Sequence, residues 1–275
     1  DDIGVWFDYD TDEGEAIEVK MGISYVSIEN ARLNMNTEQP GFDFDKVRTA
    51  ASTMWNKDLS KVQVEGGTKD EKTIFYTGMY HLLIHPNILQ DVNGEYPMME
   101  SLKIGHTTGN RYTVFSLWDT YRNVSTLMTL LYPERQLDII RTMLDMYREN
   151  GWLPKWELYG RETFTMEGDP SIPYIVDAWM RGLRDFDEQT AYEAMRKGAT
   201  TPGEFNLLRP DANDYFSKGY VPLREQYDNS VSHALEYYIA DWNLANVAQA
   251  LGKKEDAKLF RDRSLGYKHY YSKEF

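Results

Sequence analysis

The spacing of apolar residues changes along the chain from strand-like to helical. Residues 3–7, 16–21 and 23–27 alternate or run extended, and a turn-rich segment at 10–14 separates the first two. A few strands without a second layer are only marginally stable in water. We therefore predict that residues 1–28 are the last strands of a β-sheet whose remainder lies before Asp1.

From residue 44 onward the apolar repeat becomes helical. Apolar residues between 44 and 59 recur at steps of three and four, which predicts one stripe facing a core. Asp43 is a suitable N-cap for this helix. Thr68 and Glu71 match a capping box for the next helix, which is expected to end near Pro86.

The remaining helices are joined by connections of alternating length. Pro133 suits a first helical turn and Gly151 a helix end. The predicted helices cover residues 116–131, 133–150, 173–184, 187–198, 230–251 and 254–270. Long loops at 90–112, 152–173 and 201–229 separate them, and such loops are usually functional. This predicts a ring of helical hairpins with its long loops at one end, because a solenoid would require a sequence repeat and none is present.

Composition narrows the classes of function. The formal charge of −14 argues against nucleic acid as a partner, because binding phosphates requires clustered Lys and Arg. The sequence contains no run of about 18 apolar residues, so no membrane-spanning helix is predicted. The absence of cysteine excludes disulfides and thiolate zinc sites. The aromatic content of 14% fits either ordinary core packing or faces that stack on sugars.

Two segments combine aromatic and charged residues. Residues 116–122 (SLWDTYR) place Trp118 beside Asp119, and Arg122 follows one helical turn later, where it is expected to keep the carboxylate ionised. Residues 151–158 (GWLPKWEL) place Trp156 beside Glu157. Each segment fits a sugar subsite. The first also fits a core Trp with a surface Asp–Arg pair, and the second also fits a hydrophobic plug that packs the loop onto the helices.

Other candidate chemistry is less specific. Glycosidic bonds are cleaved by paired carboxylates, and no pair stands out among the acids near aromatics: Asp169, Asp177, Glu225, Asp228, Glu236 and Asp241. His81 and His85 have the spacing of two zinc ligands on a helix, but no third ligand is marked. Residues 91–96 resemble the start of a calcium loop without its later Glu, and a tight turn is expected instead.

Several segments together resemble glycoside hydrolase family 92, the calcium-dependent exo-α-mannosidases. They occur in the family's order over nearly the whole chain: VKMGISYVS at 19–27, ENAR at 29–32, FYTGMYH at 75–81, FSLWDTYR at 115–122, GWLPKW at 151–156 and SVSHALEY at 230–237. The resemblance implies a mainly α chain that forms part of an (α/α)6 barrel. It assigns residues 1–28 to the end of an N-terminal β-sandwich, 29–67 to a helical linker and 68–275 to the first part of the barrel.

The same resemblance implies an activity and a set of residues. The expected reaction is release of terminal mannose from α-mannosides by an inverting enzyme of the α-1,2-mannosidase type, with calcium binding the sugar hydroxyls. Trp118 and Asp119 match residues that hold the mannose, and Arg122, Trp156 and Glu157 are further candidates for that pocket.

The family's later segments are missing from this sequence. These are a Glu-Gly-Asn-Ala-Trp-Gln type segment with the general acid, a Gly-Asn-Glu-Pro segment, and an acidic segment before Met-Ser-Ala-Trp with the base. No catalytic or metal-binding residue is therefore expected in this chain. Both are expected beyond Phe275, so the chain alone is expected to be inactive. Its expected partners are α-mannoside glycans and the rest of its own polypeptide. An export signal before Asp1 and a periplasmic or extracellular location are also expected.

Two alternatives stay open. The chain is also compatible with a non-catalytic mannose-binding or scaffold module, and with a different (α/α)6 glycosidase.

Overall fold

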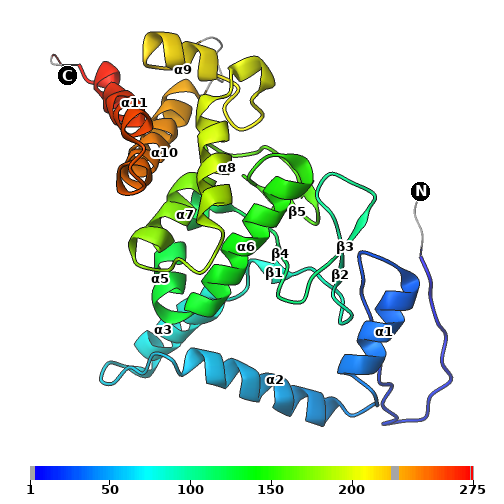
Figure 1. Cartoon of the computed structure of the whole chain (residues 1–275). Coiled ribbons are helices and arrows are strands. Elements are labelled where there is room, and N and C mark those ends of the chain that lie inside the picture. The colour runs from blue at the N-terminus through cyan, green and yellow to red at the C-terminus, as the bar shows by residue number, and fades with distance from the viewer. Residues whose placement is uncertain (1–3, 224–228, 273, 275) are drawn as a thin grey trace.

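The computed structural model describes residues 4–223, 229–272 and 274, and this part of the chain is mainly helical (Figure 1). The α-helices are α1 (Ile28–Glu38), α2 (Phe44–Leu59), α3 (Lys69–Leu82), α4 (Leu117–Thr120), α5 (Val124–Leu131), α6 (Pro133–Asn150), α7 (Ser171–Met180), α8 (Glu188–Thr200), α9 (Ala212–Lys218), α10 (Ser230–Ala250) and α11 (Lys254–Ser264). Short antiparallel strands pair as β1 (Asn87–Ile88) with β4 (Tyr112–Thr113), β2 (Glu95–Pro97) with β3 (Ile104–His106), and β5 (Glu157–Leu158) with β6 (Arg161–Glu162).

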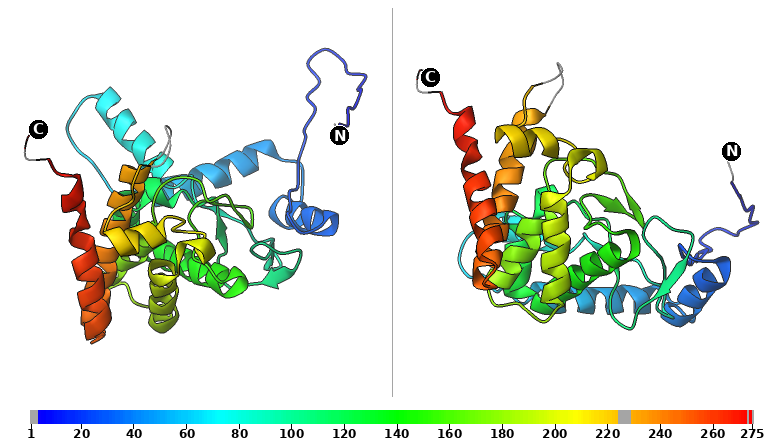
Figure 2. Two further views of the ribbon diagram at one scale, coloured as in Figure 1. Left: turned by 90° about the horizontal axis from the view of Figure 1, so that it is seen from above. Right: turned by 45° about the horizontal axis from the view of Figure 1, so that its top comes forward.

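The hydrophobic core lies among the helices that follow α3. α10 packs against α11, α7 and α8, and α5 packs against α6 and α7 (Figure 2). The most buried side chains of the core include Ile140, Met143 and Ile172, which are fully excluded from solvent. The core is continuous across these helices, so it gives the loops between them a rigid base.

The predicted ends of α6 are confirmed. Pro133 occupies the first helical turn, where its missing N–H is not needed. Gly151 ends the helix in the left-handed conformation at φ 86°, and its N–H donates to the Tyr147 carbonyl. Lys197 of α8 donates to the Gly151 carbonyl over 2.7 Å. The start of the 152–173 stretch is therefore fixed to two helices.

The strands predicted in residues 3–27 are not formed in the described part of that segment. Residues 4–27 contain no strand, and Ile3 lies outside the described residues. A strand requires a partner, and this segment instead bonds to α1: Asn34 donates to the Ile23 carbonyl over 2.8 Å. Its apolar side chains, such as Trp6 at 81% exposure, remain open to solvent.

α2 forms with the predicted N-cap, because Asp43 accepts from the Lys46 N–H over 2.9 Å. The expectation that its apolar stripe faces a core is wrong, since no residue of α2 is buried. Only its C-terminal end packs, where the ring of Trp55 lies 4.6 Å from that of Tyr80 in α3. Periodicity specifies which face of a helix is apolar but not which element covers it. The capping box of Thr68 and Glu71 at the start of α3 is confirmed.

Two predicted elements differ in detail. The helix predicted over 116–131 is interrupted between α4 and α5, because Tyr121 and Arg122 turn their side chains toward α10. The loop predicted at 201–229 contains α9 within its described part, and α9 ends at Gly219. Within the described residues, no helix combines the length and the apolar character that crossing a bilayer demands.

Candidate substrate-binding site

The structure joins the two candidate segments through their backbones. The Phe115 N–H donates to the Glu157 carbonyl over 2.9 Å, and the Leu117 N–H donates to the Lys155 carbonyl over 3.4 Å. The segment leading into α4 therefore lies along the loop leading into β5. This pairing brings the neighbourhood of Trp118 and Asp119 next to that of Trp156 and Glu157, although 37 to 39 residues separate the two pairs in the sequence.

Trp118 and Asp119 present different surfaces. Asp119 is exposed, and it accepts a short hydrogen bond from the Ser116 hydroxyl through Oδ2. Trp118 is half-buried against the core, and its indole Nε1 has no hydrogen-bond partner among the described residues. The exposed Asp119 carboxylate offers acceptors to a polyhydroxylated ligand, whereas the Trp118 Nε1 is itself buried.

The predicted ion pair between Arg122 and Asp119 is not formed. Arg122 Nη2 lies 2.6 Å from Glu236 Oε1 on α10 instead. The Tyr121 hydroxyl donates to Glu236 Oε2 over 2.7 Å and accepts from Arg122 Nη1 over 2.8 Å. The prediction failed because the helix ends at Thr120, so Arg122 leaves the face that carries Asp119. The Arg122 guanidinium still lies 5.6 Å from the centre of the Trp118 ring.

Glu157 is placed inside the loop and not on its surface. Its side chain has no solvent exposure, and its carboxylate accepts from the Thr113 hydroxyl, the Val114 N–H and the Gly160 N–H. Burial raises the pKa of this carboxyl to about 7, against the opposing effect of those donors. In this arrangement Glu157 holds β4 and β5 together. The direct contact of Glu157 with a sugar stays a prediction.

Trp156 lines a cavity of about 180 Å³ together with Ser116, Thr120 and Tyr174. Its backbone N–H is held by Glu162 over 2.9 Å. Its indole Nε1 is buried and lacks an acceptor among the described residues, as does that of Trp118. Trp156 therefore contributes an apolar wall to this cavity close to α4.

A second polar cluster fastens the far end of the 152–173 stretch. His233 of α10 lies between two carboxylates, with Nε2 2.7 Å from Glu167 Oε2 and Nδ1 3.3 Å from Asp211 Oδ2. Burial lowers the pKa of the nearby Lys155, against the opposing charges of Asp169 and Glu167. The cluster joins the loop before α7 to α10 and to the start of α9.

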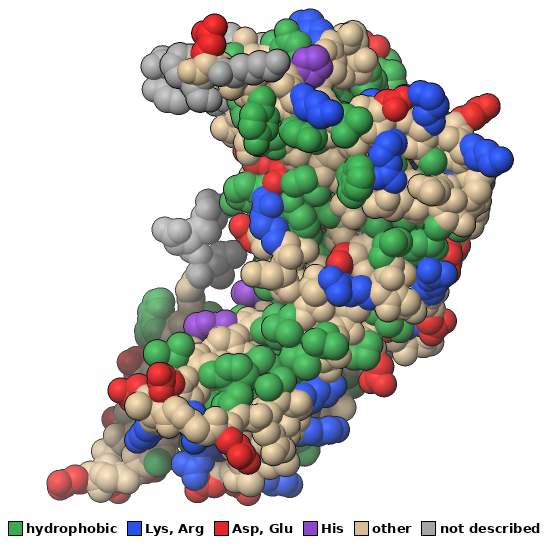
Figure 3. Space-filling view, turned by 90° about the vertical axis from the view of Figure 1, so that its left-hand side faces the viewer, with side chains coloured by type: hydrophobic (Ala, Val, Ile, Leu, Met, Phe, Trp, Pro, Cys, Tyr) green, Lys and Arg blue, Asp and Glu red, His purple; other side chains and the backbone are tan. Residues whose placement is uncertain are grey.

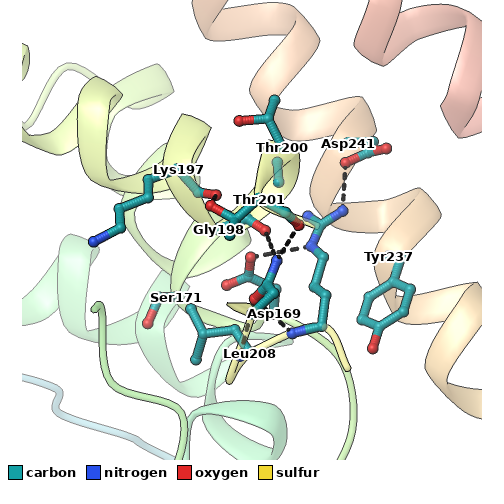
Figure 4. Close-up of polar contacts among 12 residues, drawn as sticks. Asp169, Ser171, Lys197, Gly198, Thr200, Thr201, Leu208, Tyr237 and Asp241 are labelled. Atoms are coloured by element: carbon teal, nitrogen blue, oxygen red, sulfur yellow. Dashed lines mark hydrogen bonds and ion pairs between the residues drawn. The ribbon is translucent and has the colours of Figure 1, made fainter. Parts of the chain in front are cut away.

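Behind this cluster lies a buried ionic network centred on Arg209. Its guanidinium donates to Asp169 over 3.2 Å and to Asp241 over 2.8 Å, and Tyr237 lies beside it (Figure 4). Asp241 also accepts from Arg263 over 2.7 Å. Burial opposes the charge of Arg209, but the two carboxylates outweigh it and raise the pKa of the guanidinium. The network links the loop after α8 to α10 and α11, and both of its carboxylates are paired with arginine.

The acids named from the sequence thus have structural partners. Asp169 and Asp241 hold Arg209, Glu236 holds Arg122, and Asp177 holds Arg181. Glu225 and Asp228 lie outside the described residues. Sequence reasoning missed the roles of Glu236 and His233, although both lie in the SVSHALEY segment that carried the resemblance.

The metal-like patterns do not assemble into a site. His85 lies beyond the end of α3 at Leu82, so His81 and His85 do not share a helical face. The tight turn at 91–96 is confirmed by a 2.8 Å bond from the Gly94 N–H to the Asp91 carbonyl. The Asp91 carboxylate is buried and accepts from Asn30 and Asn34 of α1. Across the described ranges, no group of three His, Asp or Glu side chains is placed to hold a metal ion.

Helical hairpins whose loops gather aromatic and acidic side chains form a domain suited to a carbohydrate. The model of the glycosyl hydrolase family 92 catalytic domain matches residues 30–275, and the chain belongs to this family.

Solved structures of family members share this fold. The chain is 35% identical to the family GH92 α-mannosidase BT3965 from Bacteroides thetaiotaomicron, with a TM-score of 0.81 over 89% of this chain and 32% of that one. It is 31% identical to the inverting mannosidase BT2199 of the same organism, with a TM-score of 0.84 over 91% of this chain and 34% of that one.

A fungal relative is similar in sequence. The chain is 27% identical to an uncharacterised secreted glycosidase from Arthroderma benhamiae over 87% of this chain and 29% of the relative. The chain therefore spans about a third of the length of each of these relatives.

Proposed function

We propose that this chain is part of the catalytic domain of an α-mannosidase. The whole protein releases terminal mannose from α-mannosides with inversion at the anomeric carbon, and its substrates are α-1,2-linked. Membership of family 92 supports the reaction class, and two mannosidase structures at 35% and 31% identity support the sugar. One of these relatives is described as inverting.

The proposed architecture is the first part of an (α/α)6 barrel over residues 68–275, a linker over 29–67 and the end of a β-sandwich over 1–28. An exposed apolar stripe on α10 supports an unfinished ring. Val231, Leu235 and Ile239 recur at steps of four and are each at least 36% exposed. Hydrophobic side chains also gather in patches on the side of the molecule shown in Figure 3. Such a stripe is typical of a helix that packs on another, and the rest of the same polypeptide is the proposed partner.

The proposed mannose-binding residues are Trp118 and Asp119, with Arg122, Trp156 and Glu157 as further members of the pocket. The observation that carries this assignment is the exposed Asp119 carboxylate on α4, beside the half-buried ring of Trp118. Ionised carboxylates form the stronger class of hydrogen bonds with hydroxyl donors. An aromatic face contributes apolar contact area to a sugar ring.

The chemical step is proposed to use residues outside this chain. The described carboxylates with buried positions are engaged with arginine, with backbone N–H groups, with His233 or with the side-chain amides of α1. The described residues do not supply a three-ligand metal site either. We propose that calcium, bound by other parts of the whole protein, contacts the sugar hydroxyls. Within this chain, the residues bind and orient the mannose.

A panel of aryl glycosides given to the whole protein tests the function. We expect turnover of the α-mannoside and not of α-glucosides, and proton NMR should show β-mannose as the first product. Turnover of a glucoside alone would indicate a different (α/α)6 glycosidase. Mannoside binding without turnover would indicate a non-catalytic binding module. Activity that persists after thorough chelation would exclude the calcium role.

We also propose export to the periplasm or the extracellular space. The description of the Arthroderma relative as secreted supports this location. Fractionation of cells that express the whole protein tests it, and recovery in the cytoplasmic fraction would contradict it.

A further inference from the structure

Arg122 pairs with a distant carboxylate and not with the one nearest in the sequence. Asp119 precedes it by three residues; burial opposes the charge of Arg122, and Glu236, followed by Tyr121 and Asp119, raises its pKa. The guanidinium is nevertheless paired with Glu236 at 2.6 Å, and it also donates to Tyr121, which donates to the same carboxylate. Glu236 thus has both oxygens occupied and directs Arg122 away from Asp119.

The position of Glu236 is fixed by its surroundings. Its side chain is only 9% exposed, and it projects from α10, which packs on three other helices. Gly168 covers it from the other side. A Cβ at Gly168 would lie 2.3 Å from the Glu236 Cβ, a distance that only glycine allows. The start of the Glu236 side chain is therefore closely packed against Gly168, and its carboxylate meets Arg122.

The consequence for Asp119 is an open carboxylate. Its Oδ2 accepts a hydrogen bond from the Ser116 hydroxyl, and its side chain is exposed. An Arg fork on this carboxylate would occupy its lone pairs with two parallel N–H donors. Those lone pairs are the ones that the hydroxyls of a sugar need, because an ionised carboxylate can only accept hydrogen bonds.

We propose that Glu236 is a positioning residue that holds Arg122 on α10, so that Asp119 stays available to the hydroxyl groups of a pyranose ring. This inference rests on the proposed function and extends it to a residue 117 positions away from Asp119. Neutralising Glu236 releases Arg122, which then turns back toward Asp119, three residues earlier in the chain, and competes with the sugar for this carboxylate.

The test is a double-mutant cycle in the whole protein with an aryl α-mannoside. Glu236→Gln keeps the side-chain length and still accepts from Tyr121, so it removes the charge with little change in shape. We expect KM to rise about 10- to 100-fold, as expected for interference with a hydrogen bond to a charged group, with a smaller change in kcat. In an Arg122→Gln background, the same Glu236→Gln change should leave KM within about threefold, because no guanidinium remains to be released.

Thermal melting of each variant separates positioning from loss of folding. Asp262→Asn, which neutralises an exposed carboxylate paired with Lys258 on α11, is the matched control and should leave KM unchanged. Equal KM effects of Glu236→Gln with and without Arg122 would overturn the inference, as would a lowered melting temperature with unchanged KM. A wild-type protein that neither binds nor cleaves the mannoside would refute the proposed function itself. An active wild type with an unaffected Glu236→Gln variant would refute only the positioning role.

Discussion

Asp169 and Arg209 form an ion pair at 3.2 Å in a place where neither side chain is more than 2% exposed. Arg209 bridges Asp169, which lies directly before α7, to Asp241 in the middle of α10. A charge in such a position is tolerated only while its partners remain, because removing it from water costs several kcal/mol. The network therefore ties the loop after α8 to the start of α7 and to α10.

Arg209→Met should destabilise the protein strongly. The substitution leaves Asp169 and Asp241 buried with one cation fewer, and breaking a buried pair in this way costs about 3–5 kcal/mol. The measurement is the midpoint of urea unfolding followed by circular dichroism. Arg181→Met, which removes a partner from an exposed pair with Asp177, is the control, and about 1 kcal/mol or less is expected there. Similar midpoints for the two variants would show that the network does not contribute.

Glu157 should make stability fall as the pH rises. Its pKa is about 7 in the folded protein against an ordinary value of 4.5, because burial disfavours the charged form. Between these two values the folded state binds a proton that the unfolded state has lost, so stability is highest below pH 4.5 and decreases up to pH 7. With about 1.4 kcal/mol for each pH unit, the contribution is on the order of 3 kcal/mol.

The measurement compares melting temperatures at pH 5 and pH 7.5. Glu157→Gln cannot titrate, so its melting temperature should differ less between the two pH values than that of the wild type. Glu134→Gln, at an exposed position in the first turn of α6, should keep the wild-type difference. An unchanged difference in Glu157→Gln would mean that another group causes the pH dependence.

Local signals predicted the helices well. The Asp43 cap, the Thr68–Glu71 capping box, and Pro133 and Gly151 at the ends of α6 are each decided by a few neighbouring residues, and each was confirmed. The predictions that failed were those of structure that depends on distant partners. Residues 4–27 have the pattern of strands, but a strand forms only beside another, and the described residues offer them none.

The sequence pointed to the two segments of the candidate site but not to the contacts that their side chains make. Trp118 and Asp119 are neighbours in the sequence, and the structure places them beside the Trp156 segment, as a shared pocket requires. The pairing of Arg122 with Glu236 spans 114 residues, and no local rule selects it over the nearer Asp119. Glu157 looked like a ligand contact because it follows a Trp, but burial of its carboxylate is a tertiary property.

Asp119→Asn should weaken mannoside binding by the whole protein while leaving its stability nearly unchanged. Asp119 is exposed and keeps a hydrogen bond to Ser116 after the change, so folding depends little on its charge. Loss of a charged acceptor for sugar hydroxyls is expected to cost about 1.5–3 kcal/mol, or roughly 10- to 100-fold in KM. Asp185→Asn, at an exposed residue paired with Arg141, is the control. A KM that does not differ from that of the control would remove Asp119 from the pocket.

Gly168→Ala should impair both stability and substrate binding, because it acts on the residue that holds Arg122. Gly168 has φ 75°, which L-residues adopt only with strain, and an added Cβ would overlap the Glu236 Cβ at 2.3 Å. Strain and overlap together are expected to cost about 2–4 kcal/mol. Relief of the overlap requires Glu236 to move, so KM for the mannoside should rise as it does in Glu236→Gln.

Gly182→Ala is the matched control for Gly168→Ala, since Gly182 has φ 92° but nothing within 4 Å of an added Cβ. Backbone strain acts in both variants, whereas displacement of Glu236 occurs only at Gly168. Melting temperature should therefore fall in both, and KM should change in Gly168→Ala alone. A KM that stays at the wild-type value in Gly168→Ala would show that α10 absorbs the overlap without moving Arg122, and that this contact does not set the geometry around Asp119.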